Sequence, residues 1–215
     1  MFSKRSRRLA RAGLLALAAG ASLLGCGSSA TLSNMWKDPS YQLGRMSSIL
    51  VVAMKPDPAR RRMWEDGLVA GLAEHGVTGT PSYRLFQSLP DTAAVIEAVR
   101  RDHYEGVLVA RKLPTETFEK YVEGYTTTEP RSAFNPWSQT YQTYYVEVNQ
   151  PSYTEQGKIV RHEVHLWTTK EGGRLVWAGT GESIDPGSSE QVLKECRKLV
   201  VPALASAGFI APKSK

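Results

Sequence analysis

Hydrophobic residues group into short runs and helical stripes that predict alternating strands and helices. Residues 49–54 form a continuous apolar run, as expected for a strand buried on both faces. Asp57 can cap a helix that begins at Pro58, along which apolar residues recur every four positions from Trp64 to Leu72. Charged residues between them are expected on the polar surface of this helix, namely Arg61, Arg62, Glu65 and Asp66.

A second round of the same pattern follows. Residues 77–86 contain a strand interrupted by Gly and Pro, which indicates an edge position. Asp91 can cap the next helix, and residues 107–110 form another apolar run. Strand, helix, strand, helix and strand in this order predict a βαβαβ arrangement with right-handed crossovers.

The second half of the chain changes to an antiparallel pattern. Apolar and polar residues alternate over 158–170, a tight turn is expected at 171–173, and 174–183 runs back. Ser188 begins a capping box for a final helix, inside which Pro202 is expected to kink or split the helix. The sequence therefore predicts a single α/β (α+β) domain, whose mixed sheet has a βαβαβ start and an antiparallel C-terminal hairpin.

The N-terminal 26 residues have a different pattern. Five basic residues and no acidic residue accompany an apolar stretch over 12–24, which is too short to remain as a spanning helix. Leu23-Leu24-Gly25-Cys26 follows, and this arrangement resembles the lipobox of bacterial lipoproteins. The resemblance implies that 1–25 is a removed signal peptide and that Cys26 receives the lipid. The alternative is an ordinary signal peptide with an incidental cysteine.

Lipidation implies a membrane anchor made of acyl chains. No later apolar run approaches the ~20 residues that a spanning helix needs. Gly27, and not Asp, follows Cys26, which by resemblance to lipoproteins of two-membrane bacteria implies the outer membrane, facing the periplasm. Residues 26–35, rich in Ser and Gly, are expected to form a flexible lipidated tether, with the domain at 36–215.

The basic charge of the chain belongs largely to the signal. Five of the 27 Lys and Arg residues lie in it, which leaves 22 basic against 21 acidic residues. Nucleic acid is excluded as a partner, because binding phosphates requires a basic stripe. With Cys26 lipidated, Cys196 has no disulfide partner. Cys196 falls on the apolar stripe of the last helix, which favours a core role over a nucleophile.

Candidate catalytic and metal motifs are weak. His162 and His165 are three residues apart on a predicted strand, so they point to opposite faces and do not form a metal site. Gly179-Thr180-Gly181 lacks the third glycine and the helix of a dinucleotide loop. We therefore expect no catalytic residues, no metal and no cofactor.

The segment 113–156 has an unusual composition, because 9 of the 19 aromatic residues of the chain lie between 113 and 153. Tyr and Trp suit protein interfaces and sugar platforms, but strands also favour them. Three interpretations stay open: strand residues and a loop packed over the sheet, an exposed partner surface, or a glycan platform. The candidate partner-binding residues are Tyr121, Tyr125, Trp137, Tyr141, Tyr144 and Tyr145.

The order of elements and the hairpin from His165 to Trp177 resemble a group of envelope domains. These are the α/β domains of the N-terminal part of TolB, the curli secretion lipoprotein, the penicillin-binding-protein activator lipoproteins and other outer-membrane lipoproteins of similar layout. The resemblance implies a binding or assembly module without catalytic residues, and the segment 113–156 departs from it.

We therefore expect a lipid-anchored, non-enzymatic cell-envelope protein that contacts an envelope protein or peptidoglycan. A purely structural subunit of an oligomeric envelope assembly is a further possibility. The alternative is a periplasmic lipoprotein that binds, or hydrolyses, a small ligand or glycan. Its pocket would lie between the sheet and the segment 113–156, and a cluster of acidic groups there would favour it.

Overall fold

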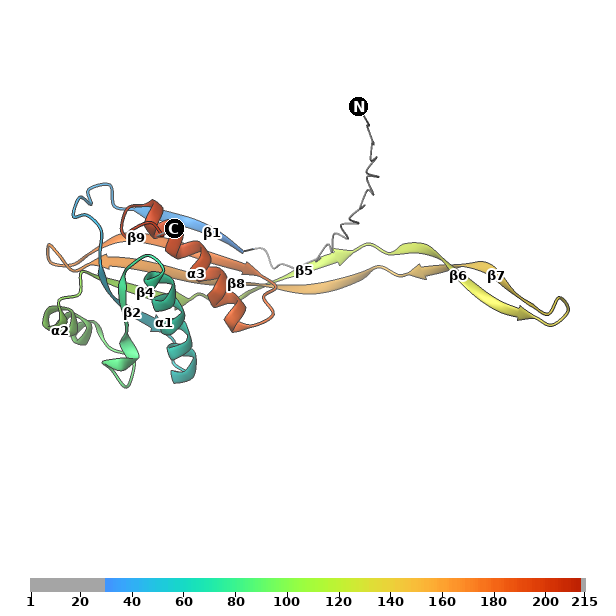
Figure 1. Ribbon diagram of the computed structural model, residues 1–215, viewed down its shortest axis with the longest axis horizontal. Helices are drawn as coiled ribbons and strands as arrows, with labels where there is room; N and C mark the ends of the chain where they lie inside the picture. The colour runs from blue at the N-terminus through green and yellow to red at the C-terminus, as the bar shows by residue number, and fades with distance from the viewer. Residues whose placement is uncertain (1–29, 214–215) are drawn as a thin grey trace, which may run out of the picture.

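A seven-stranded mixed sheet lies at the centre of the computed structural model, which describes residues 30–213 (Figure 1). Its path is β1-β9-β8-β4-β2-β3, and β5 pairs with the first half of β8. These strands are β1 (Ala30–Lys37), β2 (Ser48–Met54), β3 (Thr78–Pro81), β4 (Gly106–Lys112), β5 (Glu116–Val122), β8 (Tyr153–Thr168) and β9 (Arg174–Ile184). The predicted α/β (α+β) class is confirmed.

The predicted βαβαβ unit is formed around β2, which pairs in parallel with both β3 and β4. Its helices are α1 (Pro58–Ala73) and α2 (Thr92–Asp102), with a short 3-10 helix, η1 (Ser82–Arg84), between β3 and α2. Alternate residues of β2 face two cores, as the apolar run predicts. Ile49 and Val51 pack with α1 and α3 (Ser189–Ser206), whereas Leu50 and Val52 pack on the side of α2.

The predicted helix caps are all present. Asp57 accepts a hydrogen bond from the Arg60 amide at 2.7 Å, and Asp91 accepts one from the Ala94 amide at 2.8 Å. Ser188 caps α3 in the same way. Pro202 lies inside α3, which continues on both sides of it, so of the two expected outcomes, a kink or a split, the split is wrong. Buried side chains on both sides of the proline keep this helix on the sheet, namely Val200, Val201 and Leu204.

The C-terminal hairpin also follows the sequence. β8 and β9 pair antiparallel, and the residues of the turn between them, Glu171 to Gly173, all have positive φ. The alternation along β8 buries Val160, His162, Val164 and Leu166 against the helices. On the opposite face, charged residues pair with one another, as in the ion pair of Arg161 with Glu182 at 3.0 Å.

The tether prediction is wrong for residues 30–35. They belong to β1, which pairs antiparallel with β9 and covers its outer edge. Leu32 packs against the core and the Ser33 hydroxyl donates to Glu182 at 2.5 Å, so an apolar and a polar contact hold the strand. Pairing with β9 also satisfies the backbone hydrogen-bonding groups of this segment, so it is ordered as a strand. Cys26, the signal 1–25 and the rest of the tether lie outside the described residues.

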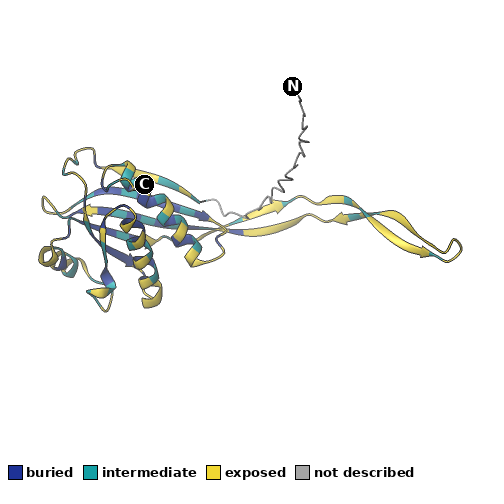
Figure 2. Ribbon diagram, viewed as in Figure 1, coloured by how far each residue is buried: buried dark blue, intermediate teal, exposed yellow. Residues whose placement is uncertain are grey.

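Residues 116–159 form an arm that projects from the domain (Figure 1). Its inner part is β5 paired with β8, and its outer part is a separate two-stranded sheet of β6 (Tyr125–Asn135) and β7 (Thr140–Gln150). From Glu116 to Asn135 the chain advances about 65 Å, at roughly 3.3 Å per residue. Figure 2 shows that nearly the whole arm is exposed. Its aromatics are strand residues apart from Trp137, which agrees with one part of the interpretation as strand residues and a loop packed over the sheet, but their packing over the sheet is wrong. None of the helices described here is long and apolar enough to cross a membrane.

Candidate functional sites: an aromatic arm and a cationic pocket at its root

The arm consists of two ribbons joined at a glycine. At Gly124 an added Cβ would lie 2.6 Å from both the Gln150 carbonyl oxygen and the Ser152 amide nitrogen, so only glycine fits this close approach. In the inner ribbon, the Phe118 ring covers Gly157 on the opposite strand. This cross-strand cover is a known way of stabilising a strand glycine.

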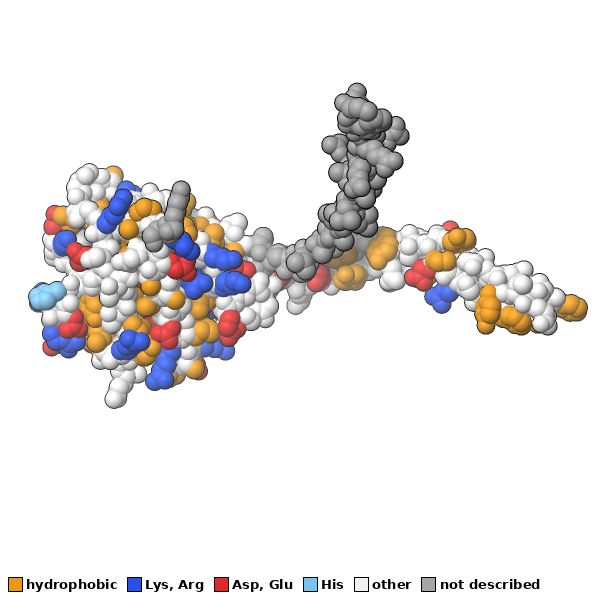
Figure 3. Space-filling view, in the orientation of Figure 1, with side chains coloured by type: hydrophobic (Ala, Val, Ile, Leu, Met, Phe, Trp, Pro, Cys, Tyr) orange, Lys and Arg blue, Asp and Glu red, His pale blue; other side chains and the backbone are white. Residues whose placement is uncertain are grey.

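The outer ribbon presents two different faces. Direct cross-strand partners share a face, and Phe134 is paired with Tyr141, while Pro130 is paired with Tyr145. These four residues, Pro130, Phe134, Tyr141 and Tyr145, are called the tip face below. The Phe134 and Tyr141 rings meet edge-on, with centroids 5.4 Å apart. Figure 3 shows apolar side chains gathered towards this end of the arm.

The candidate partner-binding residues do not form one surface. Tyr141 and Tyr145 lie on the tip face, and Trp137 lies in the turn between β6 and β7. Tyr125 and Tyr144 lie on the opposite face of the outer ribbon. Tyr121 is further back, on the inner ribbon. The tip face and the turn therefore form the most concentrated aromatic surface.

Exposure of these side chains is large. Trp137 is 95% exposed, Tyr141 76% and Tyr145 72%. A two-stranded ribbon with nothing packed on either face is only marginally stable in water, and contiguous exposed apolar groups mark interaction sites. The arrangement is thus suited to contact with another molecule along the outer ribbon.

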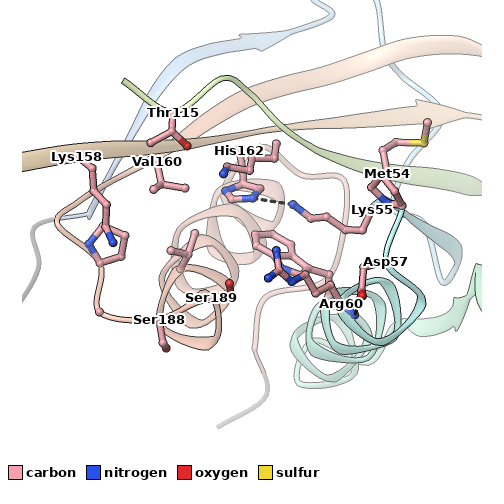
Figure 4. Close-up of a pocket in the computed structure, with 16 residues that line it drawn as sticks. Met54, Lys55, Asp57, Arg60, Thr115, Lys158, Val160, His162, Ser188 and Ser189 are labelled. Atoms are coloured by element: carbon pink, nitrogen blue, oxygen red, sulfur yellow. Dashed lines mark hydrogen bonds between the residues drawn. The ribbon is translucent and has the colours of Figure 1, made fainter. Parts of the chain in front are cut away.

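A pocket of about 750 Å³ opens at the root of the arm. β2 ends there, α1 and α3 begin there, and the two strands of the arm leave the domain beside it. Figure 4 shows side chains from all of these elements around the cavity. The charged residues that line it are Lys55, Asp57, Arg60, Lys112 and Lys158.

Lys55 and His162 form the floor of the pocket. The Lys55 Nζ atom lies 2.8 Å from the His162 Nε2 atom, and both residues are buried. The His162 ring stacks on Trp64, with centroids 4.1 Å apart, and the Lys55 ammonium lies 4.3 Å from the centre of the Trp64 ring. The indole face attracts the ammonium through a cation–π interaction.

Burial lowers the pKa values of both Lys55 and His162. Burial and the nearby Lys112 charge lower the pKa of Lys55 to about 8, so its side chain is mostly protonated at pH 7. Burial, with Lys55 and Lys112, lowers the pKa of His162 to about 3, so its imidazole is neutral. A protonated lysine beside a neutral histidine therefore forms the resting state of the pocket floor.

Positive charge dominates the lining. Within residues 30–213, Lys55, Arg60, Lys112 and Lys158 have no carboxylate within ion-pair distance. The acidic residue of the lining is Asp57, whose carboxylate caps α1. The acidic cluster that would favour a hydrolytic pocket is not found among these lining residues.

The two histidines of the sequence motif lie on opposite faces of β8, as predicted. His162 is buried, while His165 lies on the opposite face beside Glu163, at 3.3 Å. Cys196 is buried in the core, and burial raises the pKa of its thiol to about 12, which confirms the predicted core role. Among the described residues, no group of three or more His, Cys, Asp and Glu side chains is placed to hold a metal ion.

Comparison with known proteins finds structural neighbours of low sequence identity. No family model and no curated protein matches the chain. A PelC dodecamer from Paraburkholderia phytofirmans is 12% identical, with a TM-score of 0.43, over 86% of this chain and 100% of that one. A dodecamer of a point variant of the same PelC gives 12% identity and a TM-score of 0.42, over 83% of this chain and 98% of that one.

A PDZ domain protein from Parabacteroides distasonis is 10% identical, with a TM-score of 0.33, over 86% of this chain and 38% of that one. Similarity at these levels carries no argument about function. The resemblance of the mature chain to TolB-type envelope domains stays a prediction.

Sequence reasoning missed the pocket, although a signal for it is present. Lys55 directly follows the apolar run of β2, and Lys112 ends β4, the parallel neighbour of β2. The carboxyl ends of parallel strands meet at one edge of a sheet, where ligands commonly bind in open α/β sheets. His162 is the direct cross-strand partner of Lys112, and it therefore joins the same edge.

Proposed function

We propose that this protein is a lipid-anchored, non-enzymatic cell-envelope module that binds another envelope protein through the aromatic end of its arm. The observation that carries the proposal is the outer ribbon, which exposes its largest aromatic side chains and contributes no residue to the core clusters. A segment that adds little to the stability of the domain and exposes Tyr and Trp is typical of a partner surface.

The position of the first described strand supports a functional link between anchor and arm. Ala30 is paired with Ser183 of β9, and Ser183 is paired with Val160 of β8, directly beside the arm root. Three residues separate Cys26 from Ala30, and the four residue steps between them span at most about 14 Å in an extended chain. Acyl chains on Cys26 would thus hold the arm root close to the membrane surface and raise its effective concentration for partners there.

Site-specific photocross-linking in intact cells tests the partner surface. A photoreactive phenylalanine analogue at Tyr141 or Tyr145 should capture one defined protein, whereas the analogue at Tyr144, on the opposite face, should capture it weakly. The Tyr141→Ala and Tyr145→Ala double variant should lose the complex while keeping its fold. Capture of cell-wall fragments and no protein, or equal capture from both faces, would contradict the proposal.

The anchor has a separate test. Metabolic labelling with a palmitate analogue should mark the protein, and Cys26→Ser should abolish the label and release the chain from the membrane fraction. An unlabelled, unprocessed wild-type chain would contradict lipid anchoring. It would not decide the partner surface, which the cross-linking experiment tests separately.

A further inference from the structure

The pocket at the arm root contains a buried hydrogen-bond donor that has no acceptor. An ammonium group can only donate, so in the 2.8 Å contact with Lys55 the Nε2 atom of His162 accepts. A neutral imidazole then carries its proton on Nδ1. This Nδ1 atom is buried without a hydrogen-bond partner, and His162 itself is only 3% exposed. An unpaired buried donor is unfavourable, and a ligand acceptor would remove the cost.

Unpaired positive charge surrounds this donor. Lys55, Arg60, Lys112 and Lys158 come from four different segments and meet at one cavity without ion-pair partners among the described residues. Two nearby carboxylates have local roles: Asp57 caps α1, and Asp185 accepts a hydrogen bond from the Lys158 amide at 2.6 Å. A third, Glu190 in the first turn of α3, is close enough for the Arg60 charge to contribute to lowering its pKa, but it forms no ion pair with Arg60. Like charges repel when gathered in this way, unless an anion is shared between them.

Two helices add to the positive potential. The helices α1 and α3 are 16 and 18 residues long, and both begin at the lining of this cavity. The positive end of a helix dipole favours an anion, and Ser188 and Ser189 at the start of α3 bring hydroxyl groups to the wall. Figure 4 shows these side chains with Arg60, Lys158 and His162 around the same space.

We infer that this pocket binds the phosphoryl group of a phosphate-ester ligand, with Lys55 and the Nδ1–H of His162 at its base and Arg60 and Lys158 at its mouth. A phosphate monoester carries close to two negative charges and three strong acceptor oxygens, which suits four cations better than a single carboxylate does. The inference is independent of the proposed use of the arm, because the pocket and the tip face share no residue.

The size of the cavity indicates a ligand larger than inorganic phosphate. Its volume of about 750 Å³ lies in the range of organic ligand sites. The phosphoryl group can belong to a soluble phosphate ester or to a phospholipid headgroup, and the chemistry of recognition is the same for both.

Calorimetric titration of inorganic phosphate into the detergent-solubilised full-length protein tests the site, with chloride at matched ionic strength as the reference titration. His162→Phe keeps an aromatic ring on Trp64 but removes the donor, and Lys55→Met keeps the stem but removes the charge. Arg62→Gln is the matched control, because Arg62 lies on α1, outside the pocket lining, over the Tyr83 ring.

We expect saturable binding to the wild type, a loss of about tenfold or more in affinity in His162→Phe and Lys55→Met, and no change in Arg62→Gln. Should either pocket variant fail to fold, Arg60→Gln and Lys158→Gln at the exposed mouth provide the same test with a smaller loss. Absence of saturable phosphate binding, or equal affinity in pocket and control variants, would overturn the inference.

Two further arms of the experiment identify the source of the phosphoryl group. Competition by soluble glycerol phosphate without binding to phosphatidate vesicles would assign a free phosphate ester. Binding to phosphatidate vesicles but not to phosphatidylcholine vesicles, lost in His162→Phe, would assign a headgroup. Either result supports phosphoryl recognition, and failure of both competitors against bound inorganic phosphate would overturn the ester assignment.

Discussion

Arg61 and Glu65 form a fully buried ion pair one turn apart on α1, with Nε and Oε1 3.0 Å apart. The sequence predicts both residues on the polar surface of this helix, and that prediction is wrong. Glu65 accepts hydrogen bonds from the Ser82 hydroxyl at 2.7 Å and from the Tyr83 amide at 2.8 Å. It also accepts one from the Ala53 amide at 3.1 Å. The pair thus ties the end of β2 to α1 and η1.

Glu65→Gln should therefore lower the free energy of unfolding by about 3–5 kcal/mol, because it leaves the Arg61 guanidinium charged and buried without its carboxylate. Urea denaturation followed by circular dichroism measures the change. The Arg61→Met and Glu65→Gln double variant should be more stable than Glu65→Gln alone, since the unpaired charge is gone. A single-variant loss below about 1 kcal/mol would contradict this role.

The regular part of the fold is predictable because local and tertiary preferences agree there. The cap at Asp57, the apolar run of β2 and the turn at 171–173 each contain their own signal within a few residues. β1 has no such signal. It follows a Gly-Ser-Ser run and shows no clear alternation of apolar and polar residues, and pairing with the edge of β9, distant in sequence, makes it a strand.

The candidate sites likewise combine features that the sequence shows with features that depend on tertiary contacts. The aromatic content of the segment 113–156 is visible in the sequence, but its projection as an arm depends on the long pairing between 116–135 and 140–159. The pocket depends on contacts across the sheet, such as that of Lys55 with His162, 107 residues apart. Periodicity alone reports which face a residue occupies, and it does not report what meets it there.

Lys55→Met should raise the free energy of unfolding at pH 7 by about 1–3 kcal/mol. The pKa of Lys55 is lowered to about 8 chiefly by burial, so the folded state binds this proton less tightly than the unfolded state does. Between pH 8 and the ordinary lysine pKa of 10.5, the unfolded chain binds more protons than the folded state does. The free energy of unfolding of the wild type therefore rises with pH in this range. The advantage of the variant should therefore shrink between pH 7 and pH 10 in parallel urea titrations, and a variant less stable than wild type at pH 7 would contradict this account.

His162→Phe should flatten the pH dependence of stability on the acid side. Burial and the Lys55 charge lower the pKa of His162 from 6.5 to about 3, so below pH 6.5 the unfolded state takes up a proton that the folded state refuses. This group makes the wild type lose stability as the pH falls, by up to about 1.4 kcal/mol per pH unit. Between pH 6.5 and pH 5, wild type should lose about 1.6 kcal/mol more than the variant in urea titrations, because the unfolded histidine is only half protonated at pH 6.5.

A control variant tests whether the buried His162 imidazole is the group that titrates. His165→Phe, on the exposed face of the same strand, is the matched control and should keep the wild-type slope. Parallel slopes in wild type and His162→Phe would show that the buried imidazole is not the group responsible.

Removal of the outer ribbon should leave the domain intact. Replacing residues 123–152 by Asn-Gly would close the inner ribbon directly after the Val122–Tyr153 pair with a two-residue turn that suits antiparallel strands. No side chain of β6 or β7 belongs to the core clusters, so the melting temperature should change by no more than about 2 °C. The truncated protein should still bind phosphate as the full chain does, because the pocket lining lies outside the deleted residues. A drop of about 8 °C or more in differential scanning calorimetry would show that the ribbon supports the domain, and would contradict its assignment as a segment that acts on a partner.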